Sequence, residues 1–77
     1  MTAKECYKRI PKSPKEHLVE CTDFGDFYGF VFSETDEAFG GAYRCMKKDG
    51  GDVFMFNPTD DFELFDKGKM LDLSDIK

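Results

Sequence analysis

The sequence has little of the chemistry that most enzymes need. Its 77 residues include a single histidine, His17, and no tryptophan. Acid–base and triad chemistry usually requires a histidine paired with a nucleophile or a carboxylate in a cleft. On a strand, His17 and Cys21 would share a face but lie too far apart for a hydrogen-bonded pair. Because nucleophile, base and cofactor motifs are all missing, we predict that the protein is not an enzyme and binds no cofactor.

Cysteine is also scarce. Cys6, Cys21 and Cys45 are odd in number and scattered, so no disulfide framework emerges and buried free thiols are expected. With His17 they could supply four zinc ligands, but no pair has the two-to-four-residue spacing of a zinc knuckle or ribbon. The sequence therefore predicts no metal site.

Long apolar runs and glycine-rich loops are absent as well. No run approaches the roughly 18 residues that span a bilayer, and residues 1–10 lack the apolar stretch of a secretory signal. This predicts a cytoplasmic protein that begins at its native start and has no membrane contact. The two Gly-Gly pairs lack the spacing of a dinucleotide-binding or Walker loop, so they are interpreted as a bulge and a turn.

Positive charge is limited and unevenly placed. The chain has 11 Lys and Arg against 16 Asp and Glu, a net charge of −5. Residues 1–16 sum to +3 and residues 17–77 to −8, since −8 + 3 = −5. A nucleic-acid binder needs the opposite sign over most of its surface, so no nucleic-acid partner is predicted.

Aromatic residues, in contrast, are plentiful. They make up 16% of the chain, and nine are Phe. Because each buried ring removes a large area from water, this content favours a packed core over disorder. At this length the core belongs to one domain, residues 1–77.

A helix is predicted at the N-terminus. From Ala3, apolar residues recur at i, i+3, i+4 and i+7, which makes one apolar stripe on a helix. Thr2 and Glu5 form a capping-box pattern, and Pro11 ends the helix.

Four strands are predicted after the helix. Alternation in the first places His17, Val19 and Cys21 on one face. The second is apolar on both faces, which indicates a central strand, and its Gly29 would let an aromatic ring lie against the backbone. Turn residues follow the first and third strands. The predicted strands are Glu16–Thr22, Phe27–Ser33, Ala42–Lys48 and Val53–Phe56.

A helix of about two turns is predicted between Thr59 and Gly68. Thr59 is the expected N-cap, and Gly68 fits the position after the last cap. Residues 70–73 are either an edge strand or an extended tail. The predicted fold class is α+β: an N-terminal helix packed on a four-stranded antiparallel meander, followed by a short C-terminal helix.

Two candidate surfaces follow. Phe62 and Phe65 either close the second face of the sheet or leave an aromatic patch exposed, drawn from Phe24, Phe27, Phe39, Phe54 and Phe56. Carboxylates in loops and caps could serve only turns and solubility, or could hold a cation, although no cation-binding motif is present. They could also bind a partner, and the residues predicted for this are Asp23, Asp26, Glu34, Asp36, Glu37, Asp60 and Asp61.

Three segments resemble known proteins. They are Asp23–Phe30, residues 40–43 and Asp60–Lys67. They are similar to small uncharacterised proteins from gut bacteria and their mobile elements, and to a lesser degree to small α+β immunity proteins of polymorphic toxin systems. The resemblance implies an N-terminal helix with an antiparallel sheet. Tyr28 or Phe27 stands where such proteins often have Trp, and no catalytic residue carries over.

The leading functional hypothesis is a small acidic protein-interaction module of inhibitor or immunity type that binds a basic partner. The alternatives are a homodimeric structural or phage-related component, and a small-molecule binder with a pocket lined by Tyr7, Tyr28 and Phe30.

Overall fold

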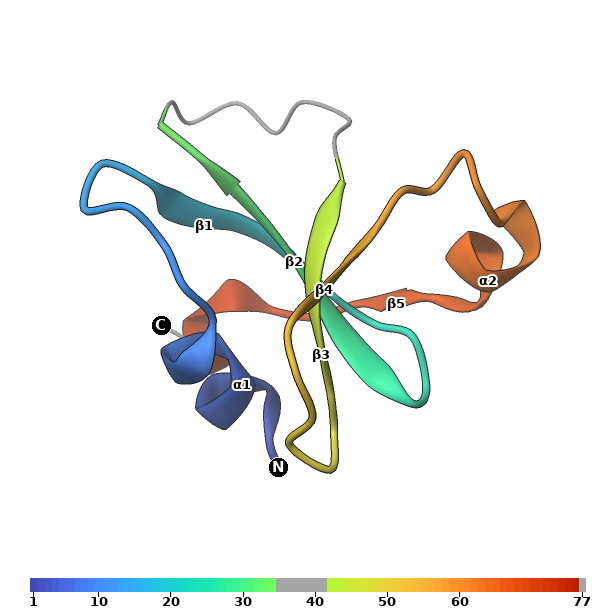
Figure 1. Ribbon diagram of the computed structural model, residues 1–77, viewed down its shortest axis with the longest axis horizontal. Helices are drawn as coiled ribbons and strands as arrows, with labels where there is room; N and C mark the ends of the chain where they lie inside the picture. Colours follow the sequence, from blue (N-terminus) through green and yellow to red (C-terminus); the bar gives the residue numbers. More distant parts are fainter. Residues whose placement is uncertain (35–41, 77) are drawn as a thin grey trace.

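The computed structural model describes residues 1–34 and 42–76. It is an α+β fold in which a helix packs on one antiparallel sheet of five strands, in the order β4-β3-β2-β1-β5 (Figure 1). This confirms the predicted class and adds one strand. The elements are α1 (Ala3–Arg9), β1 (His17–Asp23), β2 (Phe27–Ser33), β3 (Tyr43–Lys47), β4 (Phe54–Phe56), α2 (Phe62–Lys67), β5 (Lys69–Met70) and the 3₁₀ turn η1 (Leu73–Asp75).

The first helix begins and ends as predicted. The Thr2 hydroxyl accepts a hydrogen bond from the Glu5 backbone N–H at 3.2 Å, and the Glu5 carboxylate accepts one from the Thr2 N–H, which completes the capping box. Ile10 is the C-cap, directly before Pro11. No helix in the described ranges is both long enough and apolar enough to cross a bilayer.

Strand β2 lies between two apolar clusters, one on each face of the sheet, and contributes side chains to both. The first cluster includes Cys6 of α1 and Ile76 near the C-terminus, and Leu64 of α2 packs on the second. Figure 1 shows α1 and α2 on opposite sides of the strands. The two clusters confirm that both faces of β2 are buried. The first cluster contains Cys6, Ile10, Leu18, Cys21, Phe30, Met46 and Ile76. The second contains Phe24, Phe27, Val31, Tyr43, Cys45 and Phe56.

Strand β1 departs from simple alternation. Its pairing with β2 shifts between Leu18 and Glu20, so Val19 is the extra residue of a bulge. Val19 packs against the second cluster, whereas Cys21 belongs to the first. The prediction that Val19 and Cys21 share a face was therefore wrong, because one inserted residue reverses the alternation that follows it.

Gly29 has the role that the sequence predicted for it. A Cβ placed on Gly29 would lie 2.6 Å from Cε2 of Phe24 and 3.1 Å from Cδ1 of Tyr43. The Phe24 ring therefore lies directly on the β2 backbone, and it is only 5% exposed.

Replacing Gly29 with alanine is expected to destabilise the fold by about 1–3 kcal/mol, because the Phe24 ring that must give way is buried and packed against the rings of Phe27, Tyr43 and Phe56. Gly51→Ala is the matched control, since the nearest atom to its Cβ would be 3.6 Å away, an ordinary contact. Urea unfolding of both variants measures the difference. Equal midpoints would contradict the close approach of ring and backbone.

The C-terminal part corrects two predicted positions and settles an open one. Asp61, not Thr59, caps α2 by accepting a hydrogen bond from the Leu64 N–H at 3.0 Å. Gly68 is the C-cap itself, in an extended conformation with φ −67° and ψ 141°. A glycine is needed there because a Cβ would lie 2.6 Å from Cγ2 of Thr22. Residues 69 and 70 form an edge strand paired with β1.

Candidate interaction surface

Asp23, the first predicted partner-binding residue, is engaged within the chain. Its carboxylate lies 2.9 Å from Nζ of Lys48 and accepts a hydrogen bond from the Gly25 N–H at 2.8 Å. Partial burial acts to raise the pKa of Asp23, but these hydrogen bonds outweigh it and the pKa is lowered. Asp23 thus fixes the β1–β2 turn, in which Gly25 has a φ of +97°.

This ion pair gives a pH-dependent prediction. A carboxylate whose pKa is lower in the folded chain stabilises it above the ordinary value of 3.8, and this contribution is lost as the pH falls through the folded value. We therefore expect wild type to exceed Asp23→Asn in stability by a constant amount above about pH 5, with the difference closing below 3.8. Urea unfolding midpoints measured against pH test this. Lys48→Met removes the other partner of the pair, so it should reduce the pH dependence of stability as Asp23→Asn does. A difference independent of pH would contradict the pairing.

The other predicted carboxylates do not gather into one surface. Asp26 is exposed at the turn before β2, and Glu34 is exposed just beyond the opposite end of the same strand. Asp36 and Glu37 lie outside the described residues. Asp60 and Asp61 are exposed beside α2, and Asp61 is the cap of that helix.

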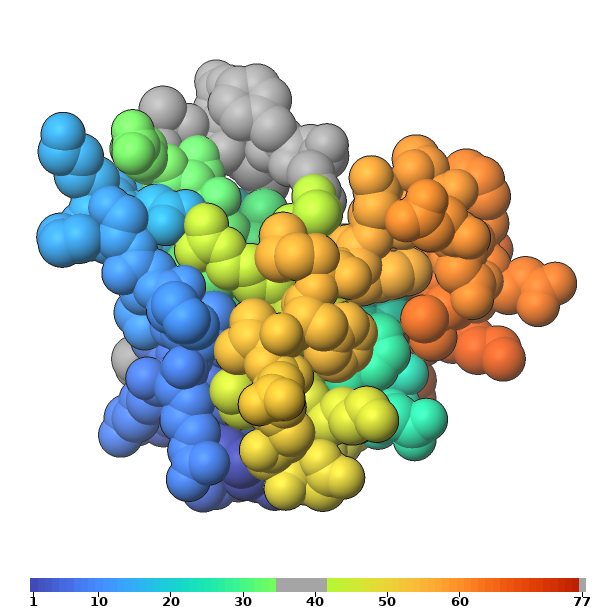
Figure 2. Space-filling view, viewed as in Figure 1, coloured from blue at the N-terminus to red at the C-terminus, as the bar shows by residue number. Residues whose placement is uncertain are grey.

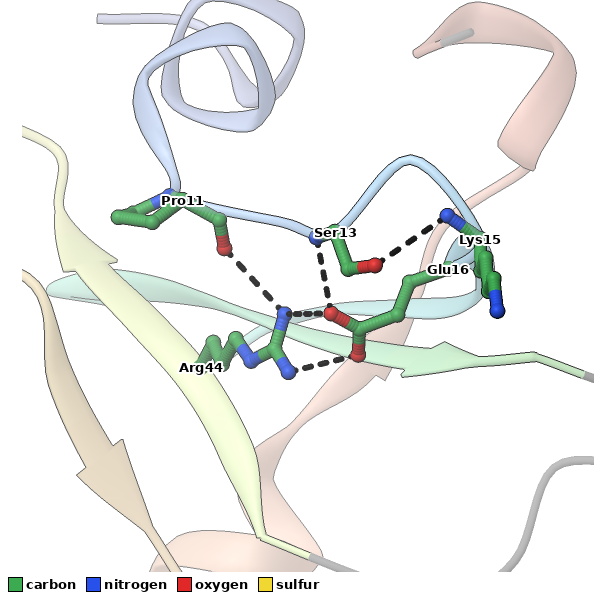
Figure 3. A network of polar contacts seen from close by, with 5 residues as sticks. All are labelled: Pro11, Ser13, Lys15, Glu16 and Arg44. Atoms are coloured by element: carbon green, nitrogen blue, oxygen red, sulfur yellow. Dashed lines mark hydrogen bonds and ion pairs between the residues drawn. The ribbon is translucent and has the colours of Figure 1, made fainter.

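A second ion pair fixes the segment between α1 and β1. The Arg44 guanidinium donates to both carboxylate oxygens of Glu16, at 3.1 and 2.7 Å, and to the Pro11 carbonyl at 3.2 Å (Figure 3). The hydrogen bond from Arg44 is the main cause of the lowered pKa of Glu16. The network fastens residues 11–16 to β3, which identifies Glu16 and Arg44 as structural residues.

The three cysteines are part of the hydrophobic core, and the rings predicted to line a small-molecule pocket are part of it or pack against it. All three cysteines are free and buried, as predicted, and burial raises the pKa of Cys21 and Cys45 to about 12, which leaves them unreactive. Phe30 is 0% exposed, and its ring centroid lies 6.2 Å from that of Tyr7. Two of the three rings expected to line a ligand pocket, Tyr7 and Phe30, therefore pack on one another, and Tyr28 packs against the first cluster. No cluster of metal-binding side chains occurs among residues 1–34 and 42–76.

Neither predicted arrangement of the aromatic residues is fully correct. Phe24, Phe27 and Phe56 are at most 9% exposed, and Phe54 is half-buried, so they form no exposed patch; Phe39 lies outside the described residues. Phe62 and Phe65 do not close the core, because they are 65% and 40% exposed. Leu64 makes that contact instead, packing on the second cluster.

The side chains on and beside α2 form a candidate interaction site. Several of them were singled out from the sequence, but not as one surface. Figure 2 shows the segment that carries this helix, in orange, projecting from the body of the molecule. The helix has no buried residue, and its two exposed rings stand among exposed carboxylates. We call this set the α2 surface. It consists of Asp60, Asp61, Phe62, Glu63, Phe65 and Asp66.

The α2 surface is held in place from beneath. Leu64 packs on the second cluster, the Phe65 ring centroid lies 6.5 Å from that of Tyr43, and Gly68 meets Thr22 and Phe24 in close contact. Leu64 and Gly68 thus anchor the segment and Phe65 is partly covered by Tyr43, while Phe62 stays largely exposed and Asp60, Glu63 and Asp66 are exposed beside it.

The comparisons with known proteins add no assignment. The chain matches no family model, and no curated protein and no solved structure is similar enough to it to count as a match.

Proposed function

We propose that this chain is a small, acidic, non-enzymatic protein-interaction module of inhibitor or immunity type. It binds a basic protein partner through the α2 surface and acts in the cytoplasm, where free thiols stay reduced. The observation that carries the proposal is Phe62, a large ring 65% exposed on a helix whose neighbouring side chains are carboxylates.

The composition of the α2 surface supports a protein partner. Aromatic anchors surrounded by a polar rim are the usual centre of protein–protein interfaces. Phe62 and Phe65 supply apolar area that the fold leaves in water, and a partner with an apolar pocket removes it.

The charge of the α2 surface specifies the kind of partner. Segment 60–66 carries four carboxylates and no basic residue. Such a surface accelerates encounter with a basic partner and disfavours acidic ones. Of the carboxylates predicted from the sequence, Asp60 and Asp61 belong to this surface, while Glu63 and Asp66 join them because they lie on the same short helix.

Site-specific photocrosslinking tests the proposal. A photoreactive phenylalanine analogue is placed at position 62, and as controls at Lys8 on α1 and Met55 on β4, both exposed. We expect a defined protein to crosslink at position 62 in host cells and not at the controls, and the purified basic protein to bind the unmodified chain. Crosslinking that is equal at all three positions, or an acidic partner, would contradict the proposal.

A homodimer formed through β4 is the second candidate. This strand lies at one edge of the sheet, and its Met55 is 61% exposed beside Val53 at 37%. An unpaired edge of this kind can pair with a second copy. Sedimentation at high micromolar concentration decides: a dimer that Met55→Lys dissociates supports it, and a monomer of 8.9 kDa removes it.

A further inference from the structure

Three lysines converge on a small hollow beside the β1–β2 turn. The hollow has a volume of about 190 Å³ and is lined by Asp23, Gly25, Lys48, Lys67 and Lys69. The lysines come from three parts of the chain, since Lys48 follows β3, Lys67 ends α2 and Lys69 begins β5. We call these five residues the lysine pocket.

The charge of the lysine pocket is opposite to that of the chain. Three ammonium groups and one carboxylate give the lining a charge of 3 − 1 = +2, while the chain as a whole carries −5. Asp23 pairs with Lys48. Lys67 and Lys69 form no ion pair with any residue in the described part of the chain. Like charges held near one another repel, and an anion between them would remove that repulsion.

One lysine of the pocket is already held in position. Lys48 Nζ lies 2.9 Å from the Asp23 carboxylate and 4.8 Å from the centroid of the Tyr28 ring. The hydrogen bond to Asp23 raises the pKa of Lys48, so its charge is retained. A positioned ammonium loses less conformational freedom on binding than a free one does.

The backbone beside these lysines is open to a ligand. At Gly25 no heavy atom lies within 4 Å of the place that a Cβ would occupy. A ligand can thus approach the main chain of the turn without meeting a side chain. The hollow is smaller than the roughly 300–1,000 Å³ that encloses a drug-sized ligand, so it suits one compact charged group.

We propose that the lysine pocket binds a compact dianion of the phosphate type, carried by a small soluble molecule. Lysine ammonium groups are common phosphate ligands, and a phosphate monoester carries about −1.5 to −2 at neutral pH, which complements the +2 of the lining. This site is separate from the α2 surface and does not depend on the proposed protein partner.

A titration of the isolated, ¹⁵N-labelled protein with inorganic phosphate tests this inference. Ionic strength is held constant with sodium chloride, and amide shifts are followed by two-dimensional NMR. We expect saturable shifts centred on Gly25, Gly68 and Lys69, and weaker shifts with acetate, a monoanion. Shifts that do not saturate, or that chloride reproduces, indicate ionic screening only and overturn the proposal.

Paired charge variants localise the effect. In Lys67→Ala/Lys69→Ala the apparent Kd for phosphate should be weaker by about tenfold or more. Lys4→Ala/Lys8→Ala removes the same charge from α1 and should leave the Kd unchanged, and the spectra themselves report whether each variant is folded. Equal weakening by both pairs would overturn the proposal. Since no protein partner is present, this result is independent of binding through the α2 surface.

Discussion

Replacing Phe30 with alanine is expected to destabilise the fold by about 3–5 kcal/mol. Phe30 is 0% exposed in the central strand and packs against the rings of Tyr7 and Phe32, so its removal leaves a cavity that the strand cannot close. A domain of this length has a total stability of only about 4–12 kcal/mol. The variant should therefore be partly or largely unfolded at 25 °C, as measured by urea denaturation followed by circular dichroism.

Phe62→Ala is the matched control for Phe30→Ala, because it makes the same substitution at a side chain that is 65% exposed. Its free energy of unfolding should stay within about 0.5 kcal/mol of wild type. A loss at Phe62 as large as that at Phe30 would show that Phe62 belongs to the core, and the α2 surface would then lose its central residue.

The second large effect concerns binding. Phe62→Ala is expected to weaken the affinity for the crosslinked partner by at least about 2 kcal/mol, or roughly 30-fold, because aromatic residues at the centre of an interface supply much of its binding energy. Isothermal titration calorimetry with purified partner measures this. Met55→Ala removes a side chain of similar exposure, 61%, from β4 and should leave the affinity within about twofold.

The opposite pattern would be informative as well. If Met55→Ala weakened binding and Phe62→Ala did not, the partner would be bound by the β4 edge, and the proposed α2 surface would be wrong.

The sequence predicts those parts of the fold that depend on neighbouring residues. The first helix was predicted from Thr2, Glu5 and Pro11, all within a few positions of its ends, and the structure confirms each role. Strand β2 was predicted over Phe27–Ser33, the same residues as observed, because its apolar faces need no knowledge of the rest of the chain. Gly29 was correctly predicted to meet an aromatic ring, although Phe24 could not be identified in advance.

Features that depend on distant residues were not predicted. The bulge at Val19 has no glycine or proline to mark it, and only pairing with β2 reveals it. Asp23 was predicted to be available to a partner, but Lys48, 25 positions further along the chain, holds its carboxylate.

The candidate site illustrates the same limit. The spacing of Phe62 and Phe65 suggested an inward face, yet in this helix of six residues Leu64 packs on the second cluster, Phe65 only partly covers Tyr43, and Phe62 is left exposed. One signal in the sequence could have helped. Taking Asp61 rather than Thr59 as the N-cap would have predicted that the helix begins at Phe62, as it does. The lysine pocket could not be predicted either, because β5, which brings Lys69 to the turn, was left undecided between a strand and a tail.

The most direct test of the account compares two triple variants that change the net charge equally, from −5 to −5 + 3 = −2. Asp60→Asn/Glu63→Gln/Asp66→Asn neutralises the α2 surface, while Asp49→Asn/Asp52→Asn/Asp75→Asn neutralises exposed carboxylates elsewhere. The measurement is the affinity for the purified partner at low and high salt. We predict that the first variant binds about tenfold or more weakly at low salt and loses most of its salt dependence, while the second binds like wild type. Equal losses in both variants, or none in the first, would contradict the account.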